Sequence, residues 1–509
     1  MVFPAIGFLT TAIATREAAL RATIPSDREA ALVALVHAQD RLLSGLDLTQ
    51  EPPNDLIHGS RLANSGGSLA FGLVLDAAPE ARSGSAHLTN HHRAQPDIQT
   101  DHWAEGFLVA CGSLIDARHV LAHLATGFMR GEVQPDGSIA AWIAQKRYPP
   151  TWRERIDLAW WSAHAHRPTT DDPVQAMDWQ FSYLPDAIIE SIPAHIWTEA
   201  VRTLVSHIDV NAPSIPIPKQ SILHHLADTL TVAPDVAEGI LSALTLDAAN
   251  ATWHAAVPGI AAAPLVRLSP ETLIPSRFGL RTQPLLFAAR ELRRRDAQNW
   301  HNAAHQRETA FRQDLAGIFA DKRFVHAPTR IQLKREGGTL RTDIDAAIFD
   351  RKTGTLALFE VKAQDPFSRS PEELERRRDS LLSANRQLSG ILDWTKRHNP
   401  DEILDRIDHQ TAKRFHVQRV LPFVLARTLV HFEDGPQPDK RAAWGTWPDV
   451  LRLNDAGTLD PAGGNPLQTL FTRIHGWRGD PPLPPATPPR VIRLETVAIV
   501  VTPTRPAQN

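Results

Sequence analysis

Three charged side chains near the middle of the chain have the spacing of a catalytic group. Asp345 lies in a short apolar segment, TDIDAAIFD, and Glu360 and Lys362 lie in the next one, TLALFEVKA. Both segments are predicted strands, and residues two apart on a strand project from the same face, so Glu360 and Lys362 lie side by side. The polar stretch 350–354 between the segments is typical of a hairpin turn, which brings Asp345 beside that pair.

Two carboxylates and one ammonium can support the hydrolysis of a phosphodiester. Mg²⁺ or Mn²⁺ prefers carboxylate oxygens and binds substrate phosphate, so Asp345 and Glu360 are a sufficient protein anchor for one ion. A metal there polarises a phosphoryl oxygen and lowers the pKa of a bound water, while Lys362 orients that water or neutralises charge at phosphorus. The sequence therefore predicts a metal-dependent phosphodiesterase.

The segments around these residues have the order of an α/β core. Apolar residues surround both acidic positions, as expected for buried central strands. A predicted helix over 305–320 precedes them and carries Glu308. A long predicted helix over 371–398 follows, and a further strand is predicted over 414–427. The predicted order is helix, strands, helix, strand.

Asp345 followed by Glu360-x-Lys362 in this setting resembles the signature of the PD-(D/E)xK nuclease superfamily. The resemblance covers roughly residues 300–430. It implies a restriction-endonuclease-like core, which is a mixed sheet flanked by helices. It also implies that Glu308, on the helix before the strands, assists at the metal site.

Some positions near the signature differ from the family pattern, and two nearby polar residues are not assigned to the site. Ile344 stands where the family's Pro precedes the Asp. Gln387 matches a Gln of an exonuclease-like branch, but Ile391 stands where that branch carries Tyr. We therefore expect Gln387 to be an ordinary helix residue. Asp343 shares a face with Asp345 and is not assigned a role at the metal.

Positive charge is concentrated around the predicted core. The whole chain has 54 Lys and Arg against 57 Asp and Glu, a net charge of −3. Residues 290–430 contain 27 basic and 20 acidic residues, a net charge of +7. The rest of the chain has a net charge of −10. A basic region suits contacts with a nucleic-acid backbone, although arginine runs also occur on solvated helix faces. The candidate contact residues are Arg293, Arg294, Arg295, Arg376, Arg377 and Arg378.

The length of 509 residues predicts several units, because a domain typically holds about 150 residues. We expect a mainly α-helical N-terminal region over 1–211, a winged-helix-like module over 221–280, the nuclease core over 285–435, and a C-terminal extension over 436–509 with a Pro-rich link and a final strand. The second helix of the winged-helix-like module has two acidic residues and no basic one, which favours packing or dimerisation over DNA contact.

The chain is expected to be cytoplasmic and not to enter a membrane. Its single Cys111 excludes an intrachain disulfide and a multi-cysteine zinc site. The apolar N-terminal segment 2–14 is too short to span a bilayer and contains Pro4. His119 and His123 are one helical turn apart, but they lack the Glu of a metalloprotease motif, and a zinc site is not expected there.

The resulting prediction is a Mg²⁺- or Mn²⁺-dependent nuclease that hydrolyses DNA, similar by fold analogy to bacterial restriction or anti-phage effectors. RNA as a substrate, protein partners of the N-terminal half and self-association stay open. One alternative is a nuclease of DNA repair or recombination. The other is a catalytically silent nuclease-fold scaffold that binds nucleic acid or a partner protein.

Overall fold

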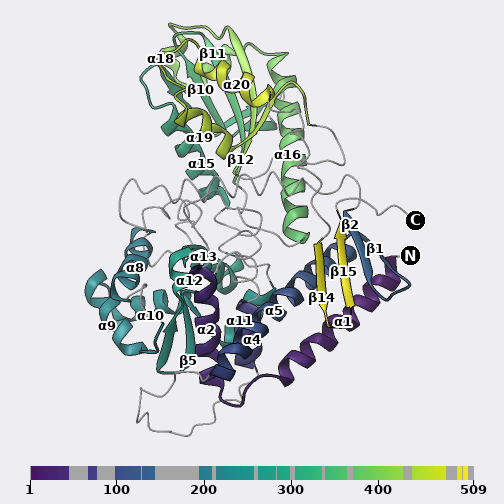
Figure 1. Cartoon of the computed structure of the whole chain (residues 1–509). Helices are drawn as coiled ribbons and strands as arrows, with labels where there is room; N and C mark the ends of the chain where they lie inside the picture. Colours follow the sequence, from purple (N-terminus) through teal and green to yellow (C-terminus); the bar gives the residue numbers. More distant parts are fainter. Residues whose placement is uncertain are drawn as a thin grey trace.

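The computed structural model is a mixed α/β protein, and its described part contains four sheets. The described residues are 2–44, 67–76, 98–127, 129–143, 194–208, 214–256, 262–282, 284–298, 304–334, 339–363, 371–427, 438–476, 490–495 and 497–502. Figure 1 shows the elements from α15 to α20 grouped at the top, and the remaining elements below them. The Pro-rich link over 480–489 lies outside the described residues.

One sheet combines two strands from the first third of the chain with the last two described strands. Its strand order is β1-β2-β15-β14, and β15 runs parallel to β2. One face of this sheet packs with the N-terminal helices around a common apolar core. The prediction of a final strand that pairs with another part of the chain is therefore confirmed. The elements are α1 (Val2–Ala22), α2 (Arg28–Ser44), α4 (Gly67–Asp76), α5 (Ile98–Ala125), β1 (Met129–Val133), β2 (Ile139–Ile143), β14 (Arg490–Leu494) and β15 (Val497–Thr502).

Helix α5 is the core helix of this unit. Its residues Gln99–Ala125 form the one described helix with the length and apolar composition to cross a membrane. However, 56% of its most apolar window is buried inside the protein. Its apolar residues belong to the same core as those of α1, α2 and α4.

A second group of elements surrounds a small sheet of order β3-β6-β5-β4. The two short helices expected in the module over 221–280 are present as α9 and α10, and β5 and β6 form a hairpin after them. That these helices pack or dimerise rather than contact DNA stays a prediction. The elements are α8 (Ala194–His207), β3 (Ile217–Pro218), α9 (Lys219–Leu230), α10 (Pro234–Ala243), β4 (Thr245–Leu246), α11 (Ala248–Ala256), β5 (Leu265–Ser269), β6 (Thr272–Pro275), α12 (Arg277–Thr282) and α13 (Pro284–Arg295).

The third group is built on a five-stranded sheet of order β13-β12-β11-β10-β7. Strands β10 and β11 are antiparallel, and β12 and β13 run parallel to β11. The elements are α15 (Ala304–Ile318), β7 (Phe324–His326), β8 (Ile331–Lys334), β9 (Leu340–Ile344), β10 (Ala346–Asp350), β11 (Thr355–Lys362), α16 (Pro371–Thr395), α17 (Asp401–Ile407), α18 (His409–Ala412), β12 (Arg419–Ala426), β13 (Ala443–Thr446), α19 (Trp447–Asp455) and α20 (Pro466–Gly476).

Helices cover both faces of this sheet. Phe359 and Val361 pack with α15, α19 and α20, while Leu356 and Leu358 pack with α16 and α17 on the other face. Both faces of β11 are therefore apolar, and every residue from Thr355 to Val361 is buried. This continuous burial is the behaviour of a central strand between two helix layers.

The packing divides the chain differently from the predicted ranges. Helix α13, placed in the nuclease core by the range 285–435, instead packs in the apolar cluster of α8, α9 and α10. Strand β13 and helices α19 and α20, assigned to the extension 436–509, belong to the five-stranded sheet and its core. The contacts of α13 with α8 and of α15 with α19 join segments that are distant in sequence, so the local pattern of the chain does not predict them.

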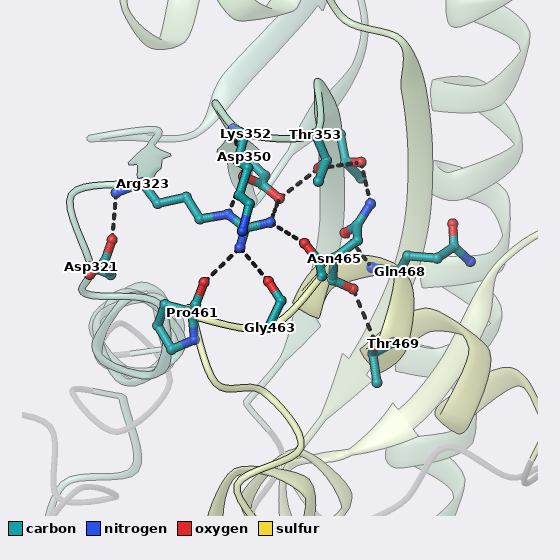
Figure 2. Close-up of polar contacts among 12 residues, drawn as sticks. Asp321, Arg323, Asp350, Lys352, Thr353, Pro461, Gly463, Asn465, Gln468 and Thr469 are labelled. Atoms are coloured by element: carbon teal, nitrogen blue, oxygen red, sulfur yellow. Dashed lines mark hydrogen bonds and ion pairs between the residues drawn. The ribbon is translucent and has the colours of Figure 1, made fainter.

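The predicted turn at 350–354 is confirmed, and its anchor is a buried ion pair. Asp350 and Thr355 close the β10–β11 hairpin. Gly354 has a φ of +63°, which favours glycine, and an added Cβ there would lie 2.8 Å from Cγ of Gln418. Arg323 donates from Nε and Nη2 to the two carboxylate oxygens of Asp350, each at 2.6 Å, as Figure 2 shows.

The same guanidinium ties the hairpin to the loop before α20. Arg323 also donates to the carbonyl oxygens of Pro461, Gly463 and Gly464 (Figure 2 labels the first two). Only 8% of its side chain is exposed, and the Asp350 side chain is fully buried. Removing one partner of such a pair leaves a buried charge without compensation.

We expect Arg323→Met to lower the free energy of unfolding by about 3 kcal/mol. Urea denaturation of the full chain measures this change. Arg351→Met, which removes a half-exposed arginine from the same turn, is the matched control and should change stability by about 0.5 kcal/mol or less. An equal decrease in the free energy of unfolding in the two variants would show that the contacts of Arg323 do not anchor the hairpin.

Candidate active site

Asp345 lies at a bend rather than inside one continuous strand. The predicted strand 342–350 is split into β9, which pairs with β8, and β10, which joins the five-stranded sheet. The break allows one segment to serve two sheets. Because Ala346 pairs with Phe359, the bend places Asp345 level with Glu360 on β11.

The predicted meeting of the three side chains is confirmed. The backbone N–H of Val361, between Glu360 and Lys362, donates to Oδ2 of Asp345 at 3.0 Å. Nζ of Lys362 donates to Oε1 of Glu360 at 2.6 Å. Glu360 and Lys362 project from the face of β11 opposite Val361, as the alternation of a strand requires.

The two carboxylates are almost completely removed from solvent. Asp345 is 2% exposed and Glu360 is 1% exposed. Oε2 of Glu360 is buried and has no hydrogen-bond partner in the described part of the chain. A buried carboxylate oxygen without a donor is costly to remove from water, and this cost favours binding of a cation at such a position. Its position beside Asp345 fits a cation held by both carboxylates.

The pKa shifts of Asp345, Glu360 and Lys362 indicate that the two buried carboxylates are not fully neutralised by nearby cations. Burial, and then the charge of Asp345, raise the pKa of Glu360 well above its ordinary value. Burial also raises the pKa of Asp345, against the opposing effects of Lys362 and Arg330. For Lys362, burial lowers the pKa, but the charges of Glu360 and Asp345 outweigh it and raise the pKa overall. Lys362 is therefore a protonated ammonium at neutral pH.

The raised pKa of Glu360 sets the direction of a pH effect on stability. The Glu360 carboxyl has a pKa of about 4.3 in the unfolded chain and a higher pKa in the folded protein. Between these two pKa values the folded state binds more protons than the unfolded state. The free energy of unfolding therefore falls as pH rises through that window. Glu360→Gln has no such titration, so its stability relative to the wild-type chain should increase from pH 5 to pH 8. Urea denaturation without divalent metal measures the free energy of unfolding of both chains at each pH. A difference between the two chains that does not change with pH would contradict a raised pKa at Glu360.

Glu308 reaches the site through an arginine that the sequence did not indicate. Arg330, in the connection between β7 and β8, forms ion pairs with Glu308 and, from Nε at 3.1 Å, with Oδ1 of Asp345. Its Nη1 lies 3.7 Å from Oδ2 of Asp343. The predicted placement of Glu308 near the acidic pair is thus confirmed, while its role at a metal stays a prediction.

Gln387 is part of the same polar group, and the expectation that it is an ordinary helix residue was wrong. Its side chain accepts a hydrogen bond from Nζ of Lys362 at 3.2 Å and donates to Oδ1 of Asp343 at 3.4 Å. Helix α16 approaches β9 at Gly390, where an added Cβ would lie 3.4 Å from Thr342. This close crossing brings the preceding turn of α16 onto Lys362.

The arginine clusters predicted to contact nucleic acid differ in their surroundings. Arg294 and Arg295, on α13, each donate from Nε to the buried carboxylate of Glu291 on the same helix, at 2.8 Å. These two arginines therefore neutralise an internal acid, which a glutamate one turn earlier in the helix could have indicated. Arg376 is exposed on α16, and the side chains of Arg377 and Arg378 lie outside the described residues. Phosphate contact by any of these residues, Arg293 included, stays a prediction.

No group of three or more His, Cys, Asp or Glu side chains in the described ranges is arranged to hold a metal ion. The candidate anchor is thus the pair Asp345 and Glu360, which is sufficient for an ion that keeps several waters. The further acids, Glu308 and Asp343, are turned toward Arg330.

Known proteins do not assign a function to this site. Comparison of the chain with models of protein families, with curated proteins and with solved structures finds no match. Any functional conclusion therefore depends on the side chains described above.

Proposed function

We propose that this chain is a metal-dependent nuclease with a restriction-endonuclease-like core. The observation that carries the proposal is the unpartnered, buried Oε2 of Glu360 beside Asp345 and the Lys362 ammonium. Helix α15, the β10–β11 hairpin, the crossover helix α16 and the parallel strand β12 support the fold assignment by their order and directions.

Asp345 and Glu360 would hold Mg²⁺ or Mn²⁺ through their carboxylate oxygens. When bound there, the ion polarises a phosphoryl oxygen and lowers the pKa of an attacking water. Lys362 is protonated, so it does not act as a general base. It donates hydrogen bonds and stabilises negative charge as it develops at phosphorus.

Gln387 and Glu360 together fix the position of the Lys362 ammonium, since both accept hydrogen bonds from Nζ. Two acceptors leave the ammonium one donor for a water or a phosphate oxygen. The burial of the strand excludes bulk water from the carboxylates and so strengthens these interactions.

DNA is the substrate that we propose, and a bacterial restriction or anti-phage effector is the proposed setting. The excess of basic residues over 290–430 supports a polyanionic substrate. The N-terminal half is the part of the chain that we propose to contact protein partners. Cys111, whose thiol has its pKa raised by burial, fits a chain that works in the reducing cytoplasm.

Incubation of the purified chain with linear duplex, supercoiled plasmid, single-stranded DNA and RNA, each with Mg²⁺ and with a chelator, tests the proposal. We expect Mg²⁺-dependent breakage of DNA. Breakage of RNA alone would change the assigned substrate. Binding of any of these polymers without breakage would favour the silent scaffold.

A further inference from the structure

The guanidinium of Arg330 lies among three carboxylates at the candidate metal anchor. It pairs with Glu308, with Oδ1 of Asp345 at 3.1 Å and, more distantly, with Oδ2 of Asp343 at 3.7 Å. One planar cation thus neutralises an acidic group drawn from α15, β9 and the bend before β10. This is the charge that a divalent ion would otherwise supply.

The hydrogen bonds of Asp345 and Glu360 show which carboxylate oxygen a metal and Arg330 would both need. Oδ2 of Asp345 accepts from the backbone N–H of Val361, and Oδ1 is paired with Arg330. Oε1 of Glu360 is paired with Lys362, and Oε2 has no hydrogen-bond partner among the described residues. An ion that uses Oε2 of Glu360 together with Oδ1 of Asp345 must therefore take the second oxygen from Arg330.

Arg330 is placed so that it can leave. It follows β7 in the four-residue connection 327–330, and 32% of its side chain is exposed. Arg323, by contrast, is 8% exposed and is held by three carbonyl oxygens in addition to its carboxylate partner. The arginine side of the pair of Arg330 with Asp345 therefore has water available to replace its protein partners, whereas the Asp345 carboxylate, 3% exposed, keeps its place.

We propose that Arg330 is an exchangeable internal cation that occupies the acidic group until a divalent metal displaces it from Asp345. The proposal rests on the metal anchor assigned above. The guanidinium and the metal compete for Oδ1 of Asp345, so Arg330 sets the metal concentration at which the anchor fills.

Titration calorimetry with Mn²⁺ on the full chain tests the competition without measuring catalysis. Arg330→Gln keeps the length of the side chain and removes its charge. We expect it to bind Mn²⁺ on the order of tenfold more tightly than the wild-type chain, because the metal no longer breaks a charged hydrogen bond. Arg419→Gln is the matched control, since Arg419 lies at the opposite end of the β11–β12 pair and donates to Gln468.

The outcomes separate this inference from the proposed function. Unchanged or weaker Mn²⁺ binding by Arg330→Gln, with binding lost in Glu360→Gln, would overturn the exchange and leave the metal anchor intact. The same tightening in Arg419→Gln would show a general charge effect and would also overturn the exchange. Absence of binding in both the wild-type chain and Arg330→Gln would remove the anchor and the exchange together.

Chemical labelling of the wild-type chain gives a second measurement that needs no variant. Phenylglyoxal modifies accessible guanidinium groups, and peptide mass spectrometry measures its rate at Arg330. We expect Ca²⁺, a non-redox divalent probe, to raise this rate several-fold while the rate at Arg323 stays constant. An unchanged or lower rate at Arg330 at a Ca²⁺ concentration that saturates the chain would contradict displacement.

Discussion

Glu360→Gln should reduce Mg²⁺-dependent DNA cleavage by at least roughly 10³-fold. The substitution replaces a carboxylate oxygen that is buried, unpartnered and adjacent to Asp345 with an amide of the same shape. An amide oxygen is a far weaker ligand for a hard divalent cation, and it supplies no charge. Because the wild-type carboxylate is costly to bury, the variant should fold at least as well near neutral pH.

The assay is conversion of supercoiled plasmid to nicked and linear forms under single-turnover conditions. Glu402→Gln, on the exposed surface of α17, removes the same charge far from the anchor and should cleave at the wild-type rate. Cleavage by Glu360→Gln within tenfold of that rate would show that this carboxylate is not part of the catalytic group.

Lys362→Met should reduce the cleavage rate by roughly 10²- to 10³-fold while Mn²⁺ binding persists. Methionine keeps the apolar length of the side chain but removes the ammonium that lies 2.6 Å from Oε1 of Glu360. The loss falls on the rate constant because Lys362 acts on charge that develops during the reaction. The metal gains a less neutralised carboxylate, so its affinity should be unchanged or higher.

Two measurements separate that effect from damage to the fold. Calorimetry measures Mn²⁺ affinity, and the single-turnover rate at saturating metal measures the chemical step. Lys352→Met, which removes an exposed lysine from the β10–β11 turn, is the control and should leave both unchanged. If Lys362→Met lost Mn²⁺ binding but recovered the wild-type rate at higher metal, Lys362 would be a structural partner of Glu360 alone.

The meeting of the three charged side chains could be predicted from sequence because its geometry is local. The turn at 350–354 and the alternation of β11 are enough to place Asp345, Glu360 and Lys362 together. The bend at Asp345 was not predicted, because the segment 342–350 contains no Gly or Pro and so gives no sign that its two halves belong to different sheets.

Arg330 and Gln387 were missed for a different reason. Each contacts the site from an element whose approach is set by tertiary packing, the β7–β8 connection for Arg330 and helix α16 for Gln387. A lone arginine or glutamine has no characteristic spacing. For Arg330 the available signal was physical, since three clustered acids require a cation nearby. For Gln387 the signal was its match to the Gln of the exonuclease-like branch, which was set aside because Ile391 stands where that branch carries Tyr.

The pairing of β15 with β2 could also not be read from local pattern. The final strand was predicted, but its partner β2 lies more than three hundred residues earlier in the chain, and no short-range periodicity encodes that distance. One consequence is experimental. A fragment that begins near residue 281 would leave β15 without β2, so the full chain is the correct material for every assay above.

Anomalous diffraction from crystals of the full chain grown with Mn²⁺ would locate the metal itself. We expect one strong Mn²⁺ peak about 2 Å from a carboxylate oxygen of Asp345 and from Oε2 of Glu360, with the Lys362 ammonium still bonded to Oε1. A fully occupied Mn²⁺ site elsewhere in the chain, with these two carboxylates free of metal, would contradict the proposed metal anchor.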